Sequence, residues 1–237
     1  RDDAPKLSAK QAKVFHHFAA RGLFATKRSR PDIHTATSFL TTRVREPDED
    51  DWKKLQRMMR YLKGSPDLAL TLGGDDDDTV KYVKWWIDGA HAVHANMRGQ
   101  TGATCSLGKG CMMSNSLKHK INSRSSTESE IISVDDMMGQ VLWTNYFLAA
   151  QGYAPEKTTV YQDNKSAILL ETNGRASSSK RTKHVNVRYF FIMDRVASGE
   201  VHLEHCPTLE MIADFFTKPL QGGLFIKLRN IIMNIKA

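Results

Sequence analysis

The pattern of hydrophobic and polar positions divides the chain into a helical beginning and an α/β remainder. Apolar residues recur at helical spacing in three early segments, and the clearest of these follows Pro47 and runs from about Asp48 to Lys63. Acidic residues stand at its start and basic residues follow, as the helix dipole favours, and Gly64 ends it. Residues 1 to about 63 are therefore predicted to be helical.

The pattern changes after a glycine-flanked acidic run at residues 73–78, which is predicted to be a solvated hairpin tip or linker. Short alternating or apolar runs then predict strands, and longer runs of 3.6-residue period predict helices. The predicted strands lie near residues 82–87, 101–107, 111–117, 158–162 and 201–205, with a hairpin turn at 108–110. Helices are predicted at 127–150, at 165–171 and around 185–196. A core helix that carries Asp214 is predicted to begin at 207–208, and a terminal helix is predicted near 224–235.

Composition and charge narrow the class of protein. The chain has 237 residues, of which 41% are hydrophobic and 25% charged, as is ordinary for a soluble globular protein. The net charge of +8 and the pI of about 9.4 favour a polyanionic partner, nucleic acid before an anionic membrane surface. No apolar run approaches the roughly 20 residues of a membrane span, so no membrane partner is expected.

The three cysteines, Cys105, Cys111 and Cys206, form no CxxC pair and no even set. They are predicted to be free thiols in a reducing intracellular compartment, cytosolic or nuclear. The chain begins without Met, which suggests a piece of a longer protein.

Four carboxylates occupy positions that a folded sheet could bring to one edge. Asp88 and Asp163 each end an apolar run that predicts a strand, and Glu128 and Asp214 lie in the opening turns of predicted helices. Hard divalent cations prefer such oxygen ligands, and a two-metal phosphodiester hydrolase needs them. For any one acid alone, and for Glu128 and Asp214 above all, a surface charge or a helix cap is the competing interpretation.

Other charged residues are predicted to play lesser roles. Glu130 lies two residues after Glu128 and therefore projects to a different side of the helix. Together with Asp135 and Asp136 it is predicted to be solvated.

A polar, basic loop follows residue 174, and its cations suit phosphate contacts that do not read sequence. Lys180, Arg181 and Lys183 are the main candidates, and a merely solvated loop is the alternative. Asn164, beside Asp163, could donate to a 2′-hydroxyl and help to distinguish RNA from DNA. His184 and His205 are left outside the catalytic set, because a lone histidine is more often structural.

Several short motifs occur in one order along nearly the whole chain. They are Arg30-Pro31-Asp32-Ile33, Met59–Gly64, Ser125–Glu130, Asp163–Ile168, Arg181–Val185, Pro207-Thr208, Ala213-Asp214 and Thr217–Leu220. The first two resemble the end of a copia-type retrotransposon reverse transcriptase, and the others resemble that family's SSTEAE, DNQGAI, RTKHI and PT…AD…TKPL. The order of strands and helices resembles ribonuclease H.

This resemblance implies an α/β, ribonuclease H-like fold, a mixed central sheet with helices on both faces, preceded by a small helical segment. Residues 1–70 would be the C-terminal helical, thumb- or connection-like part of the reverse transcriptase, 80–220 the ribonuclease H domain, and 221–237 a C-terminal helix. The Tyr-x-Asp-Asp motif of the polymerase is absent from this sequence, so the chain is not expected to polymerise DNA by itself. Relatives tend to have a Ser-Asp-Ala-Asp-like stretch where this chain has Ile87-Asp88-Gly89-Ala90-His91, which keeps the essential acid.

The resemblance also implies a mechanism and a setting. Asp88 would bridge two Mg²⁺ ions, with Mn²⁺ as a possible substitute, and Glu128, Asp163 and Asp214 would complete the coordination. The expected activity is cleavage of the RNA strand of an RNA–DNA hybrid during reverse transcription. The polymerase moiety of the same polyprotein would be a partner, in a cytoplasmic virus-like particle or in the nucleus. Two alternatives stay open: a decayed or domesticated copy that binds nucleic acid without cutting it, and a structural appendage of the polymerase.

Overall fold

Five strands form one mixed sheet in the computed structural model of the chain, which describes residues 4–74, 80–173 and 186–235. The strands are β1 (Tyr82–Ala90), β2 (Gln100–Ser106), β3 (Met113–Lys118), β4 (Lys157–Gln162) and β5 (His202–His205). Their order across the sheet is β3-β2-β1-β4-β5. Strand β2 pairs antiparallel with both β1 and β3, and β4 pairs parallel with both β1 and β5.

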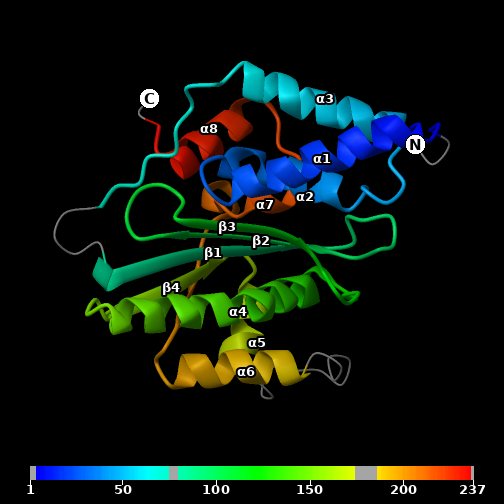
Figure 1. Cartoon of the computed structure of the whole chain (residues 1–237). Helices are drawn as coiled ribbons and strands as arrows, with labels where there is room; N and C mark the ends of the chain where they lie inside the picture. Colours follow the sequence, from blue (N-terminus) through cyan, green and yellow to red (C-terminus); the bar gives the residue numbers. More distant parts are fainter. Residues whose placement is uncertain (1–3, 75–79, 174–185, 236–237) are drawn as a thin grey trace.

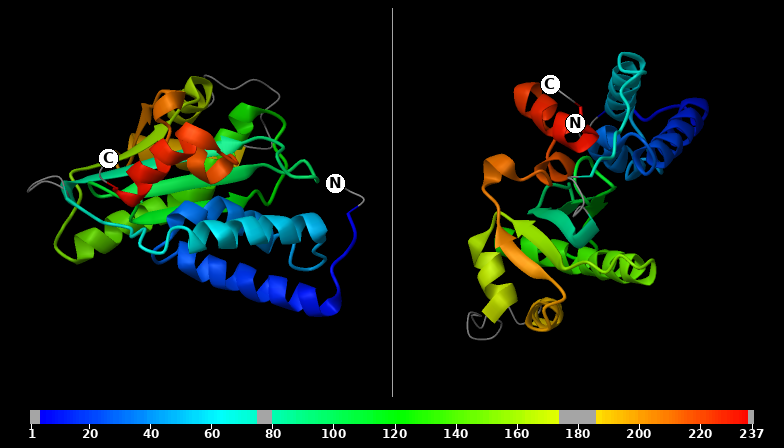
Figure 2. Two further views of the ribbon diagram at one scale, coloured as in Figure 1. Left: turned by 90° about the horizontal axis from the view of Figure 1, so that it is seen from above. Right: turned by 90° about the vertical axis from the view of Figure 1, so that its left-hand side faces the viewer.

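Helices cover both faces of this sheet, so that the protein has three layers (Figure 1). The helices are α1 (Ala9–Thr26), α2 (His34–Thr41), α3 (Glu49–Lys63), α4 (Ser126–Ala150), α5 (Lys165–Asn173), α6 (Asn186–Ala197), α7 (Asp214–Thr217) and α8 (Gly222–Met233), with short 3-10 turns η1 (Pro31–Ile33) and η5 (Thr208–Glu210). The early helices α1–α3 lie with α7 and α8 on one side, and α4, α5 and α6 lie on the other. Figure 2 shows the same arrangement from above and from the side.

The largest core lies between the sheet and α4. Alternate residues of β1, Val83, Trp85 and Ile87, are fully buried on this side, as the period of two along a strand requires. They meet apolar residues of α4 such as Val134 and Met138. The residues that alternate with them, Lys84, Trp86 and Asp88, therefore face the other side of the sheet.

A second core joins the three early helices. Helix α3 begins with a capping box, in which Asp48 and Asp51 each bind the backbone N–H of the other. Its Leu55 and Met58 are buried against α1 and α2. The predicted apolar face of this helix, including Trp52, Met59 and Leu62, packs into the same cluster.

The early helices are held to the edge strand β3 by hydrogen bonds. Lys27 Nζ donates to the Ser114 carbonyl at 2.7 Å, and Ser38 Oγ donates to the Ser116 carbonyl at 2.6 Å. His34 Nδ1 lies 2.9 Å from Ser114 Oγ. Lys27 and Ser38 thus satisfy carbonyl groups that an edge strand would otherwise expose.

Most of the predicted elements are present, with two differences. Strand β1 continues to Ala90, so Asp88 lies inside the strand instead of at its end. The single core helix predicted from residue 207 onward was wrong: a 3-10 turn and the four-residue α7 replace it. The chain leaves helical geometry at Met211 (ψ 94°), whose side chain is fully buried. The acidic run at residues 75–78 lies outside the described residues.

Candidate active site

Asp88 is the most buried acid of the candidate site, with 3% of its surface exposed. It pairs with Gly102 across the β1–β2 ladder and points away from α4, toward α7. The Thr217 hydroxyl of α7 donates a hydrogen bond to Asp88 Oδ2. Burial raises the pKa of Asp88 to about 6, and the nearby Lys218 ammonium and the Thr217 bond oppose that rise.

Glu130 reaches the same place from α4, and the prediction that it is solvated was wrong. Its side chain is 5% exposed, and its Oε2 accepts a hydrogen bond from the Gly89 backbone N–H at 3.1 Å. Burial raises the pKa of Glu130 well above its ordinary value, and the charges of Asp88, Asp163 and Glu171 raise it further. Glu171 belongs to α5 and is itself fully buried.

Gly89 makes this approach of α4 to β1 possible. A Cβ atom at this position would lie 2.4 Å from the Ser129 carbonyl oxygen, a distance that real Cβ atoms do not reach. Only glycine therefore allows the first turn of α4 to lie so close to the strand. The Glu130 carboxylate can then receive the Gly89 N–H.

Asp163 completes a group of three acids. It follows β4 directly, and Thr208 Oγ1 donates to its Oδ2 at 3.0 Å. Asp88, Glu130 and Asp163 each offer one oxygen, and these three atoms lie within 4.8 Å of one another. Ligands of one octahedral Mg²⁺ are about 3.0 Å apart when adjacent and about 4.2 Å apart when opposite, so the three carboxylates would have to draw closer together to bind one ion.

Asp214 lies beside this group at the start of α7 and is 6% exposed. Its Oδ1 is 2.5 Å from Lys218 Nζ, one helical turn further on. Burial raises the pKa of Asp214, Lys218 opposes that rise, and Asp163 adds to it. The carboxylates of Asp214 and Asp163 in turn raise the pKa of Asp88, which places all three in one electrostatic field.

Glu128 lies outside the group of three. Its Oε2 accepts the Arg124 backbone N–H at 2.6 Å, and its own N–H donates to Ser125 Oγ at 3.2 Å. Both contacts belong to the cap at the start of α4. The helix thus turns Glu130 toward the sheet and Glu128 toward the preceding turn.

Of the residues predicted to contact nucleic acid, only Asn164 lies in the described part of the chain. Asn164 Oδ1 accepts the backbone N–H groups of Ser166 and Ala167, at 3.0 and 3.1 Å, and so caps α5. Lys180, Arg181, Lys183 and His184 lie outside the described residues. His205, at the end of β5, is exposed.

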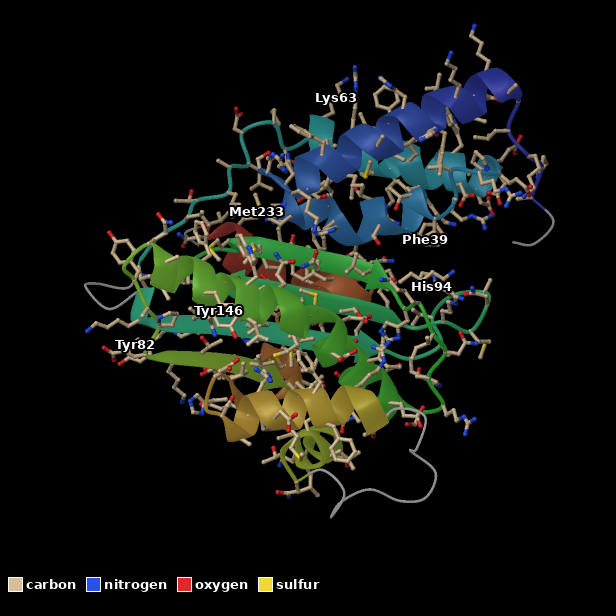
Figure 3. The ribbon with its side chains drawn as sticks, turned by 60° about the horizontal axis from the view of Figure 1, so that its bottom comes forward. Phe39, Lys63, Tyr82, His94, Tyr146 and Met233 are labelled. Atoms are coloured by element: carbon tan, nitrogen blue, oxygen red, sulfur yellow. The ribbon has the colours of Figure 1, made fainter. Side chains whose placement is uncertain are left out.

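All of these acids gather at one end of the sheet. Figure 3 labels Tyr82 at the start of β1 and His94 just beyond its end, on opposite sides of the molecule. The site lies toward the His94 end, where β1 and β4 finish and α4 begins. Sequence reasoning missed Lys218 and Thr217, although the spacing of four residues between Asp214 and Lys218 could have indicated a contact on one helix face.

Comparison with known proteins finds retrovirus-related Pol polyproteins of plant transposons among the relatives of the chain. The chain is 33% identical over 201 residues to the retrovirus-related Pol polyprotein from transposon RE2 of Arabidopsis thaliana, a match that covers 83% of this chain and 13% of that polyprotein. It is 29% identical over 215 residues to the corresponding polyprotein from transposon TNT 1-94 of Nicotiana tabacum, covering 90% and 16%. No family model matches the chain.

Two solved structures also resemble it at low sequence identity. LC11-RNase H1, isolated from compost, is 14% identical with a TM-score of 0.43, covering 58% of this chain and 93% of that one. The foamy viral protease-reverse transcriptase in complex with dsDNA is 12% identical with a TM-score of 0.44, covering 85% and 42%.

The strand order, the helices on both faces and the acids at the sheet end define a ribonuclease H-like α/β protein, the predicted fold class. The chain is a homologue of a segment of the retrovirus-related Pol polyproteins of plant copia-type transposons, which confirms the resemblance read from its motifs. It spans 13 to 16% of the length of these relatives. No helix in the described part of the chain is long and apolar enough to cross a membrane.

Proposed function

We propose that this chain carries a ribonuclease H that uses divalent ions to cleave the RNA strand of an RNA–DNA hybrid. The observation that supports it best is the convergence of one oxygen each from Asp88, Glu130 and Asp163 within 4.8 Å, with Asp214 beside them. The ions would be Mg²⁺, or Mn²⁺ in its place, because all the candidate ligands are carboxylate oxygens.

In this proposal Glu130 takes the ligand role that was predicted for Glu128. Glu130 belongs to the convergent group, whereas the described contacts of the Glu128 carboxylate belong to the helix cap. The proposed metal ligands are therefore Asp88, Glu130, Asp163 and Asp214.

The surrounding residues position these ligands. Thr217 holds Asp88, the Gly89 N–H holds Glu130, and Thr208 holds Asp163. Such contacts fix carboxylate orientation before an ion arrives. Bound ions would lower the pKa of an attacking water and stabilise the departing 3′ oxygen.

The partners belong to the same proposal. Lys180, Arg181 and Lys183 would contact phosphates of the hybrid, and Asn164 Nδ2 would contact a sugar hydroxyl while its Oδ1 caps α5. We also propose that residues 1–70 are the end of a reverse transcriptase, that 80–220 form the ribonuclease H domain followed by a C-terminal helix at 221–237, and that the rest of the Pol polyprotein is a partner. Such a polyprotein would act in a virus-like particle in the cytoplasm, or in the nucleus.

A substrate panel tests this function. The chain is incubated with a labelled RNA–DNA hybrid, single-stranded RNA, double-stranded RNA and double-stranded DNA, each with Mg²⁺ or with EDTA. We expect the RNA strand of the hybrid to be cut in Mg²⁺ alone, and the other three substrates to stay intact. Tight hybrid binding without any Mg²⁺-dependent cleavage would instead favour the decayed or domesticated copy.

A further inference from the structure

Lys218 places a positive charge among the carboxylates that are proposed to bind metal. Its ammonium is 2.5 Å from Asp214 Oδ1, and its side chain is 41% exposed whereas that of Asp214 is 8% exposed. The lysine thus approaches the buried acids from the solvent side. A long, half-exposed side chain of this kind can leave its partner without disturbing the core.

The charges around Lys218 show which acids hold it. Burial lowers the pKa of its ammonium, but the carboxylates of Asp88, Asp214 and Asp163 raise that pKa more strongly, so the net shift is upward. Lys218 also lowers the pKa of Asp88, the most buried acid of the group. The lysine is therefore attracted to three of the four proposed metal ligands.

We infer that Lys218 is a built-in counter-cation of the ion-free site, and that a divalent ion bound by Asp88 and Asp214 displaces its ammonium toward solvent. This inference rests on the proposed function, because it takes the same carboxylates as the metal ligands. An ammonium and a divalent ion cannot both lie against these oxygens without strong repulsion. Ion binding and release of Lys218 are then one exchange.

The exchange has two consequences. Without metal, Lys218 stabilises the folded protein by compensating neighbouring carboxylates that would otherwise repel one another. With metal, the same lysine weakens ion binding, because its contact with Asp214 has to be broken first. Removing the lysine charge should therefore lower the stability of the ion-free protein and tighten its ion binding.

Titration of the whole chain with Mn²⁺ and with Mg²⁺, without nucleic acid, tests this by calorimetry. We expect Lys218→Met to bind the first ion about tenfold more tightly than the parent, and Lys218→Arg to bind it like the parent because the charge is retained. Melting temperatures in EDTA and in saturating Mn²⁺ give the second readout. The parent should melt higher than Lys218→Met in EDTA, and the gain on adding Mn²⁺ should be larger in the variant.

A matched control separates this site from any surface ion pair. Lys157 Nζ lies 2.6 Å from Glu204, and Lys157 stands at the start of β4, at the opposite end of that strand from Asp163. Lys157→Met should leave ion affinity unchanged. If Lys218→Met does not fold, Lys218→Gln, which can still donate to Asp214, serves in its place.

The outcomes separate the two proposals. A parent that binds ions and cuts hybrid, with a Lys218→Met variant of equal or weaker ion affinity, would overturn the role of Lys218 alone. A parent that binds no divalent ion and cuts no hybrid would overturn the proposed function, and with it the exchange.

Discussion

Glu130 and Glu128 stand two residues apart on α4 and have different surroundings. Glu130 joins Asp88 and Asp163 and accepts the Gly89 N–H, whereas Glu128 accepts the Arg124 N–H in the helix cap. We expect Glu130→Gln to lower hybrid cleavage by about 100-fold or more, since even residues that only orient metal ligands contribute roughly 10- to 100-fold. Glu128→Gln keeps an acceptor for the cap and should cleave almost like the parent. Single-turnover cleavage rates of the two variants decide between the residues, and the reverse order would restore Glu128 as the ligand.

Asp88 gives the ion-free protein a pH-dependent stability. Its pKa is about 6 in the folded protein and 3.8 as an ordinary aspartate, so between these values the folded state keeps a proton that the unfolded state has lost. The stability that this proton contributes is present at low pH and is lost as pH rises through this window, by up to about 3 kcal/mol. The asparagine side chain of the Asp88→Asn variant does not titrate, so this variant should not lose stability in this way as the pH rises.

Urea unfolding of both proteins in EDTA, from about pH 4.5 to 7.5, measures the effect across the window between the two pKa values. The charge of Asp88 also raises the pKa of Glu130 and of Lys218, so the difference between the two unfolding free energies reports Asp88 together with its coupling to these neighbours. As the pH rises toward neutrality, the unfolding free energy of the Asp88→Asn variant should increase relative to that of the parent. A difference that stays constant with pH would show that Asp88 does not titrate in this range.

Asp163 directly follows β4, as the pattern of its strand predicts, whereas Asp88 lies inside β1 and Asp214 begins a separate short helix. The motifs that resemble the family nevertheless indicated all three acids as candidates. The sequence could not show which of Glu128 and Glu130 joins the site. Both lie in the same two turns of α4, and which one faces the sheet depends on how the helix crosses β1. That crossing is set by the close approach at Gly89, a tertiary contact that no local pattern encodes.

At the scale of elements, the site depends on the contact between the first turn of α4 and the end of β1. Gly89→Ala would place a Cβ 2.4 Å from the Ser129 carbonyl, so the helix would have to move away. We expect a loss of unfolding free energy of about 1–3 kcal/mol, together with reduced cleavage. Gly139→Ala on the same helix meets nothing within 4 Å and should be neutral or up to about 1 kcal/mol stabilising. Equal stability of the two variants in denaturant titration would contradict the close packing at Gly89.

The long helices and most of the short strands follow their sequence patterns, whereas the segment after residue 207 does not. The 25-residue α4 and the 15-residue α3 follow their patterns because many apolar residues repeat on one side of each helix. The segment from 207 to 217 contains too few residues for a period to show. There the backbone leaves helical geometry at Met211, whose side chain is fully buried. Tertiary packing of this kind commonly overrides local propensity.

At the scale of the whole molecule, the early helices cover one face and one edge of the sheet. Ser38 of α2 is 8% exposed, and its hydroxyl donates to the Ser116 carbonyl of β3 at 2.6 Å. Ser38→Ala should cost about 1–2 kcal/mol of unfolding free energy, because a buried carbonyl loses its donor. The reverse exchange Ala36→Ser, at an exposed position of the same helix, should change the unfolding free energy by no more than about 0.5 kcal/mol. Chemical unfolding that is a single transition in the parent and is unaffected by Ser38→Ala would show that the helices do not depend on this bond.

We propose that carboxylates at the sheet end bind the ions that cleave the RNA strand, and Asp88 is the most buried of the proposed ligands. Asp88→Asn keeps the size of the side chain and removes its charge. The most direct measurement is the Mg²⁺-dependent cleavage rate of a labelled RNA–DNA hybrid by the parent and by Asp88→Asn, with hybrid affinity measured in EDTA on the same samples. We predict that cleavage falls by several orders of magnitude while affinity changes little, because lysine and arginine contacts to phosphate supply most of the affinity. If the parent cleaves in Mg²⁺ and the Asp88→Asn variant cleaves equally well, Asp88 is not a metal ligand of the cleavage site.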